Sequence, residues 1–156
     1  PGLPRKHPGQ PLAAGRFRGV AVHESFGSYV ATVAEIAKTA DGGIKVERCV
    51  VASDCGIVVN PDVVRAQLEG GTGFGLSAML GEALTLENGV PTARNYDAYR
   101  VLRIDAMPRI EVHMLASAAS PTGIGECGVP PIGPAVANAI FQATGKRVRE
   151  LPFLKA

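Results

Sequence analysis

The sequence predicts an α+β fold of two layers, in which two main helices cover a mostly antiparallel or mixed sheet. Three observations support this class. Alternating apolar and polar residues flank a glycine turn at residues 41–43, a helix-capping pattern opens at Asn60, and an almost purely apolar segment covers residues 131–144. The expected order is two strands, a helix, three strands and a second helix.

The first two expected strands form a hairpin. Residues 29–36 alternate well enough for a strand, within a segment (19–39) that is rich in small and β-branched residues. The letters DGG at residues 41–43 indicate a tight turn, and residues 44–56 alternate again. Together these segments predict a β-hairpin.

The first helix is expected over residues 60–80. Asn60 can cap it, Pro61 suits the first turn because its φ is fixed, and Asp62 lies at the positive end of the helix dipole. Four glycines then fall in its middle, namely Gly70, Gly71, Gly73 and Gly75. Each costs about 1 kcal/mol relative to alanine in a helix interior. They indicate either a close approach of another group to the backbone or a break in the helix.

The rest of the chain supplies the remaining elements. Residues 81–95 are typical of a strand, a turn and a second short strand, and residues 109–116 of a further strand. The apolar helix at residues 131–144 is expected to end at Gly145, which suits the left-handed conformation of a helix C-terminus. Residues 147–153 could form a terminal strand.

Composition excludes several classes of protein. With 46% hydrophobic and 19% charged residues, the 156-residue chain is globular and suits one domain. A net charge of +2, with the basic residues scattered, gives no reason to expect nucleic acid as a partner. The three cysteines form no C-x-x-C pair, so we expect neither a metal site nor a disulfide framework. No run reaches the roughly 18 apolar residues that a membrane span needs.

The N-terminal part differs in composition from the rest. Residues 1–15 are rich in proline and glycine and are expected to be a lead-in or linker, before a single folded segment at residues 16–156. The first residue is not Met, and no signal-peptide pattern is present. We therefore expect the chain to be a piece of a longer polypeptide, which leaves its localisation open.

Several candidate sites remain ambiguous. The letters EGGTGFG at residues 69–75 could admit an anion or another ligand, but they match no named phosphate loop, and close helix packing explains them as well. His7, His23 and His113 show no ligand spacing. A polar and aromatic cluster could line a substrate or cofactor channel, or could equally be a solvated loop. Its members are Arg94, Tyr96, Tyr99, Arg100 and Arg103.

Glu126 is the strongest candidate for chemistry. It is the only carboxylate in the letters GIGECGVPPIGPAVANAIFQATGK (residues 123–146). Gly125 and Gly128 permit unusual backbone angles around it, and the prolines that follow restrict the backbone where the chain leaves this loop. Because the next helix is apolar, the acid is expected against low-dielectric surroundings that suit a general base. The alternative is a solvated, structural carboxylate near a helix N-terminus, and the residues alone favour neither.

Three motifs in order resemble one family. The letters GIGECGVPPIGPAVANAIFQATGKRVRELPF resemble the C-terminal signature of the xanthine oxidase family of molybdenum hydroxylases. DCGIVVNPDVVRAQLEGGTGFGLS and NYDAYRVLRIDAMPRIEVH are similar to two further segments of that family. The sequence of these three segments is most similar to the large (beta) subunits of the isoquinoline 1-oxidoreductase and molybdopterin aldehyde dehydrogenase type. The resemblance runs from about residue 15 to residue 153.

This resemblance implies a specific chemistry. The large subunit would hold a molybdopterin cytosine dinucleotide cofactor and oxidise an N-heterocycle or aldehyde carbon with oxygen derived from water. Glu126 would be the general base that activates the molybdenum-bound hydroxyl, and electrons would leave through an iron–sulfur small subunit. Gly125, Gln67, Gly70 and Gly71 would lie at the cofactor. Localisation in such a system would be the bacterial cytoplasm or periplasm.

The chain departs from the family pattern in two ways. Cys127 stands where relatives often carry proline, a change that we expect the loop to tolerate. The chain is also much shorter than such subunits, so we expect it to be a C-terminal part that needs the remainder of the large subunit. Alone, it is expected to bind no cofactor, to be inactive, and to self-associate through exposed apolar surface. The alternative is a non-catalytic structural or partner domain that keeps the fold.

Overall fold

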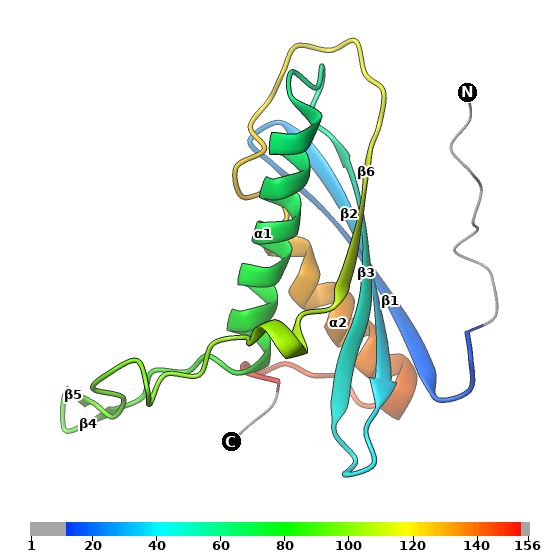
Figure 1. Ribbon diagram of the computed structural model, residues 1–156. Helices are drawn as coiled ribbons and strands as arrows, with labels where there is room; N and C mark the ends of the chain where they lie inside the picture. The colour runs from blue at the N-terminus through cyan, green and yellow to red at the C-terminus, as the bar shows by residue number, and fades with distance from the viewer. Residues whose placement is uncertain (1–11, 154–156) are drawn as a thin grey trace.

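A four-stranded mixed sheet forms one layer of the protein, which a computed structural model describes over residues 12–153. The strands lie in the order β1-β2-β3-β6 (Figure 1), and they are β1 (Arg16–Ser25), β2 (Ser28–Lys38), β3 (Ile44–Asp54) and β6 (Arg109–Met114). The first three strands pair antiparallel, and β6 pairs parallel to β3. The predicted α+β class and mixed sheet are confirmed.

Two helices form the second layer, α1 (Pro61–Leu80) and α2 (Val129–Thr144). Both pack against the same face of the sheet (Figure 1), because apolar residues on that face lie in two cores with residues from both helices. One core joins Ala34 and Ile36 to Ile132 of α2, and the other joins Val30 to Leu68 of α1. Within residues 12–153, neither helix is long and apolar enough to cross a membrane.

Strand β1 was not predicted as a separate element. It joins β2 through a two-residue turn in which Phe26 and Gly27 both have positive φ, at 55° and 77°. A turn of this kind normally carries Asn-Gly or Asp-Gly, so the letters Phe-Gly did not identify it. Gly19 in β1 lies directly under α2, since a Cβ built there would be 2.0 Å from the carbonyl oxygen of Ala135.

Helix α1 is continuous, and its glycines do not break it. Its N-terminus is capped as predicted, because Asn60 Oδ1 accepts hydrogen bonds from the backbone N–H groups of Asp62 and Val63 at 3.1 and 3.2 Å. A Cβ on Gly75 would lie 2.7 Å from Ile132 Cγ2, whereas a Cβ on Gly70 would meet nothing within 4 Å. Close packing therefore explains one of these glycines and not the other.

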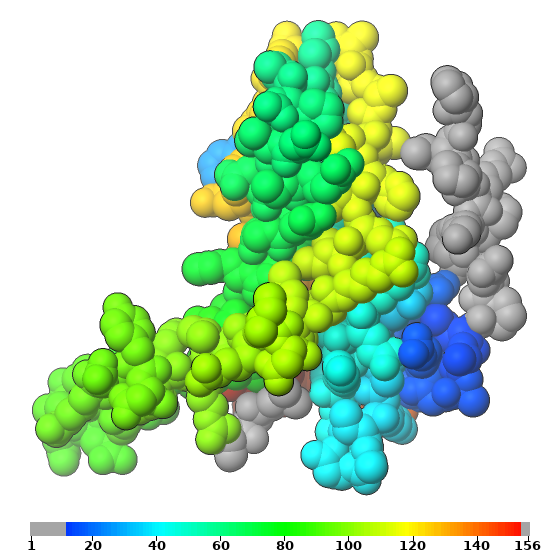
Figure 2. Space-filling model, in the orientation of Figure 1, coloured from blue at the N-terminus to red at the C-terminus, as the bar shows by residue number. Residues whose placement is uncertain are grey.

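A short hairpin projects from the body of the molecule (Figures 1 and 2). It contains β4 (Leu86–Glu87) and β5 (Val90–Pro91), joined by the predicted turn, in which Asn88 and Gly89 have positive φ. The chain returns through the short 3₁₀ helix η1 (Ile104–Ala106) to the strand β6. This arm has no apolar core of its own, since residues 83–92 are all exposed.

The prediction of a terminal strand at residues 147–153 is wrong. This segment passes the ends of both helices, and its Phe153 N–H donates to the carbonyl oxygen of Met79 at 2.8 Å instead of to a strand. Pro152 has no N–H to donate to a sheet. Gly145 does end α2 in the left-handed conformation as predicted, with φ of 70°. Of the predicted lead-in at residues 1–15, residues 1–11 lie outside the described part of the chain, and so does His7.

The face of the sheet opposite the helices carries a ladder of charges across all four strands. The carboxylate of Glu35 in β2 is 2.7 Å from the guanidinium of Arg18 in β1 and 3.0 Å from that of Arg48 in β3. Arg48 also pairs with Glu111 of β6 at 2.7 Å. Glu35 is only 6% exposed, so its charge depends on both arginines.

Candidate functional site

Glu126 lies in the loop before α2 and points away from the core. The helix begins at Val129, whose N–H donates to the carbonyl oxygen of Glu126 at 2.9 Å. The next residue, Cys127, is 1% exposed and its thiol donates to the carbonyl oxygen of Gly123 at 3.1 Å. Cys127 takes the inward position, whereas Glu126 is exposed. The expectation of low-dielectric surroundings is therefore not met within the described chain.

The carboxylate of Glu126 has no protein partner among residues 12–153, in either a hydrogen bond or an ion pair. The N-cap of α2 is Gly128, and no side chain caps the helix there. Glu126 therefore does not cap α2, although it is exposed close to the helix N-terminus, as the structural alternative expects. Its oxygens are free to exchange a proton with a bound molecule.

Glu126 lines an open cavity of about 440 Å³ between α1 and the start of α2. The other lining residues are Gly70, Gly71, Phe74, Gly125, Val129 and Pro130. At Gly70 the helix backbone forms the wall without a side chain, and packing does not require this, because a Cβ there would meet no atom within 4 Å. A Cβ on Gly71 would make an ordinary contact of 3.5 Å with Val129. The cavity thus has a bare glycine wall on α1 and a single ionisable group.

Gln67 holds the Glu126 loop and is not among the residues that line the cavity. Its side-chain Nε2 donates to the carbonyl oxygen of Gly125 at 3.3 Å, one turn before Gly71 on α1. The structure therefore brings Glu126, Gly125, Gly70 and Gly71 to one cavity. It places Gln67 at the backbone of the loop beside that cavity.

Phe74 also lines the cavity, although the sequence analysis did not single it out as a site residue. The ring is 70% exposed at the cavity. Helical spacing could have indicated this position, because Phe74 lies four residues after Gly70 and three after Gly71, so that all three share one face. Val129 and Pro130 were missed as well, although they follow Glu126 at the start of α2.

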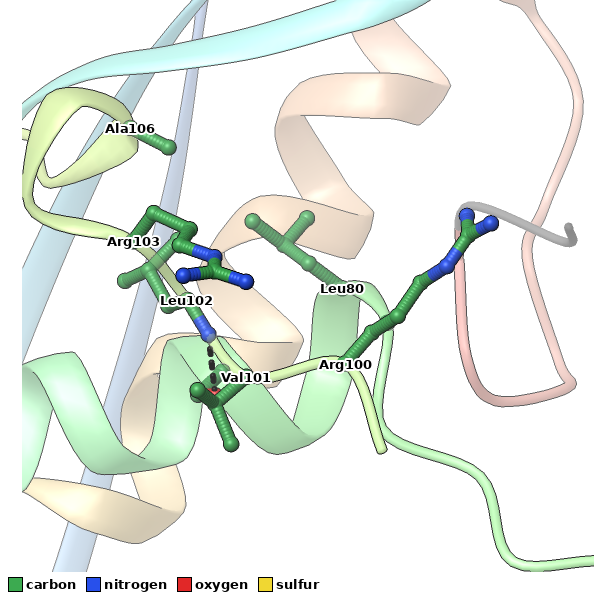
Figure 3. A pocket seen from close by; sticks show the side chains of 8 residues that line it. Leu80, Arg100, Val101, Leu102, Arg103 and Ala106 are labelled. Atoms are coloured by element: carbon green, nitrogen blue, oxygen red, sulfur yellow. Dashed lines mark hydrogen bonds between the residues drawn. The ribbon is translucent and has the colours of Figure 1, made fainter. Parts of the chain in front are cut away.

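The polar and aromatic cluster predicted near residue 100 does not gather into one site. Arg100 and Arg103 line a second, smaller cavity of about 250 Å³ at the end of α1, and Figure 3 shows their side chains pointing in different directions. The hydroxyl of Ser77 accepts a hydrogen bond from the N–H of Leu102 at 2.8 Å and fixes this segment to α1. Tyr96 is 91% exposed, away from either cavity.

The cavity at Glu126 is poorly suited to binding a phosphate. Its lining includes no lysine or arginine. The start of α2 also lacks free donors, because Pro130 and Pro131 have no N–H and that of Val129 is bonded to Glu126. Among residues 12–153 no cluster of three His, Cys, Asp or Glu side chains could hold a metal. This side of the cavity can accept a proton and admit a flat group, but it does not neutralise phosphates.

Comparison with known proteins gives consistent matches. Residues 13–108 match the family described as "Molybdopterin cofactor-binding domain". The chain is 40% identical over 111 residues to the membrane-bound aldehyde dehydrogenase (pyrroloquinoline-quinone) of Gluconacetobacter polyoxogenes, covering 71% of this chain and 14% of that protein. It is 35% identical over 139 residues to the isoquinoline 1-oxidoreductase subunit beta of Brevundimonas diminuta, covering 88% of this chain and 18% of that protein.

The crystal structure of the aldehyde oxidoreductase from Desulfovibrio desulfuricans is similar with a TM-score of 0.68 and 27% identity, covering 80% of this chain and 14% of that chain. The chain thus spans less than a fifth of the length of each of these three proteins. The structural similarity supports the two-layer arrangement of sheet and helices.

Proposed function

The chain belongs to the molybdopterin cofactor-binding domain family, and on this basis we propose that it supplies the proton-accepting side of a molybdenum hydroxylase active site. Residues 16–156 would be a segment of the large subunit, working with the remainder of that subunit and with an iron–sulfur small subunit. The names of relatives such as the isoquinoline 1-oxidoreductase subunit beta support an oxidoreductase built from subunits.

The proposed reaction converts a C–H bond of an aldehyde or an electron-poor N-heterocycle into a C–O bond. Water supplies the oxygen, the substrate loses two electrons, and two protons are released. The molybdenum cofactor, in its cytosine dinucleotide form, would supply the two-electron oxidation, and the iron–sulfur subunit would remove the electrons. The residues of this chain would accept a proton and shape the cavity around the reacting carbon.

Glu126 would be the general base of this reaction. The observation that carries the assignment is its free carboxylate, which lines a cavity and makes no hydrogen bond or ion pair within residues 12–153. A base has to be available for its proton, and a carboxylate occupied by an arginine or a helix cap would not be. Other parts of the large subunit would close the cavity and exclude water from it.

The remaining site residues would shape the cavity. Gly70 and Gly71 leave the wall of α1 flat, so a planar group can lie against the backbone. Gly125 places the loop beside this wall, and Gln67 holds its carbonyl at 3.3 Å. The cofactor's phosphates would be bound elsewhere in the subunit, since this cavity offers them no cation.

One relative carries a different cofactor in its name, pyrroloquinoline quinone. We base the cofactor assignment on the family that residues 13–108 match, which is a molybdopterin-binding one. Metal analysis of the complete enzyme tests this choice directly. About one molybdenum per large subunit is expected, and a quinone without molybdenum would overturn the assignment.

The test of Glu126 uses the complete enzyme. Glu126→Gln keeps the shape of the side chain but removes the base, so kcat should fall by about a hundredfold or more while molybdenum content is retained. Glu87→Gln, in the exposed arm far from the cavity, is the matched control and should keep full turnover. Unchanged turnover in Glu126→Gln would instead identify the chain as a non-catalytic domain that keeps the fold.

The 156-residue chain alone should bind no cofactor and turn over no substrate. The physical reason is that its cavity lacks a cation for the phosphates and is open to solvent. Reconstitution with cofactor followed by molybdenum analysis tests this expectation. Stoichiometric metal retained by the isolated chain would contradict it.

A further inference from the structure

The turn between β1 and β2 is bonded to the loop that precedes Glu126, although the two are about a hundred residues apart. Ser28, at the start of β2, is fully buried, and its hydroxyl donates to the carbonyl oxygen of Gly123 at 2.6 Å. The N–H of Gly123 donates in turn to the carbonyl oxygen of Phe26 at 3.1 Å. Both polar groups of the Gly123 backbone are therefore bonded to this one turn.

The hydroxyl of Ser28 both donates and accepts a hydrogen bond. It lies 2.7 Å from the hydroxyl of Thr122, and because its single proton goes to Gly123, Thr122 is the donor of that second bond. The N–H of Thr122 donates to the carbonyl oxygen of Cys55 at 3.0 Å, at the end of β3. Residues 122 and 123 are thus fixed from two strands of the sheet.

The two segments also fit each other closely. A Cβ built on Gly123 would lie 2.7 Å from Cβ of Phe26, and one built on Gly27 would lie 3.1 Å from Cγ2 of Thr122. Neither segment can shift by much without meeting the other. The turn therefore sets where the chain enters the loop, as Val129 sets where it enters α2.

We propose that Ser28 is a positioning residue for Glu126, acting through the backbone of Gly123. This inference rests on the proposed function of Glu126. Only two residues lie between Gly123 and Glu126, and one of them, Gly125, is a flexible glycine. With the Ser28 bond in place, the entry and exit of the loop are both fixed, so the carboxylate is held at the cavity.

Amide hydrogen exchange of the 156-residue chain, measured by NMR, tests whether Ser28 restricts the motion of the loop that contains Glu126. Ser28→Ala should speed exchange at Gly123 and its neighbours up to Cys127 by about tenfold or more, and leave α1 and β3 unchanged. Ser53→Ala is the matched control, since Ser53 is 1% exposed on the adjacent strand and its hydroxyl has no partner within residues 12–153. It should leave the loop unchanged.

If Ser28→Ala does not fold, Ser28→Cys gives the same test, because a thiol fills the buried position but donates only weakly to the carbonyl oxygen of Gly123. Faster exchange confined to residues 122–127 would support the proposal. Unchanged exchange in the loop, or an equal loss of protection across α1 and β3, would overturn it.

Kinetics of the complete enzyme test the catalytic consequence. Misplacing the base should lower kcat by about ten- to a hundredfold in Ser28→Ala, with KM and molybdenum content near those of the unsubstituted enzyme. Ser53→Ala should keep kcat. A purely structural role for Ser28 would lower the amount of folded, molybdenum-containing enzyme and leave kcat per molybdenum unchanged.

The outcomes separate this inference from the proposed function. If Glu126→Gln keeps full turnover, the proposed base is wrong and the positioning role falls with it. If Glu126→Gln abolishes turnover but Ser28→Ala changes neither loop exchange nor kcat, only the positioning role is wrong.

Discussion

Two glycines of α1, Gly70 and Gly75, should respond in opposite ways to substitution by alanine. Both lie in the interior of the same helix, so alanine gains about 1 kcal/mol of helix propensity at either position. At Gly70 the added Cβ meets nothing within 4 Å, so this gain should appear in full in the free energy of unfolding. For a chain of this length it corresponds to a rise in Tm of about 2–4 °C.

At Gly75 the same gain is opposed by overlap with α2. The added Cβ would lie 2.7 Å from Ile132 Cγ2 and 2.8 Å from the carbonyl oxygen of Val129. A backbone oxygen cannot rotate away as a side chain can, so the helices must separate, at a cost of about 1–3 kcal/mol or more. Because the helix-propensity gain is the same at both positions, Gly75→Ala should be less stable than Gly70→Ala by this overlap cost, about 1–3 kcal/mol or more.

Urea unfolding followed by far-UV circular dichroism measures both variants under the same conditions. Destabilisation of the chain by Gly70→Ala, or an equal change in the free energy of unfolding in both variants, would contradict this prediction. In the complete enzyme, Gly70→Ala should have a second effect, because its methyl group enters the cavity at Glu126. A variant that gains stability and loses molybdenum content or turnover would identify Gly70 as a glycine kept for the ligand.

Three further predictions concern the sheet. Glu35→Gln should lower the free energy of unfolding by about 2–3 kcal/mol in urea titrations, because it leaves Arg18 and Arg48 facing each other without the buried carboxylate; an unchanged midpoint would contradict this. The Arg48 guanidinium holds the pKa of Glu111 below its ordinary value, so stability present above pH of about 4.3 should be lost as pH falls through the folded pKa, and Glu111→Gln should flatten that part of the profile. Burial raises the pKa of Cys49 to about 12, so mass spectrometry should show no alkylation of Cys49 by iodoacetamide in the folded chain near neutral pH, and full alkylation in urea.

The elements that were predicted correctly each carry a local signal. Asn60 before Pro61 marks the start of α1, and Gly145 marks the end of α2, because both positions require particular backbone angles or acceptors. The turn at residues 88–89 follows from its Asn-Gly letters in the same way. In each case a few residues that are close in sequence are enough to explain the helix end or the turn.

The elements that were missed depend on distant residues. The turn at Phe26 and Gly27 is stabilised by Thr122 and Gly123, which no local pattern of letters connects to it. The segment at residues 147–153 alternates like a strand, but its Phe153 N–H bonds to the carbonyl oxygen of Met79 near the end of α1. Local secondary-structure propensity predicted an element correctly where neighbouring residues alone determine it. It failed where contacts with distant residues determine the structure.

For the candidate site, the sequence predicted the acid and the glycines but not the direction of the acid. In the turn before α2, Cys127 is buried and Glu126 beside it is exposed. The burial of α2 implied a buried Glu126, and the structure shows that a loop can expose one residue while its neighbour joins the core. Exposure matters for the proposed mechanism, because water competes with a bound molecule for the carboxylate in an open cavity. Under the proposed function, surfaces beyond residues 12–153 would close this cavity, so Glu126→Gln tests the proposed base only in the complete enzyme.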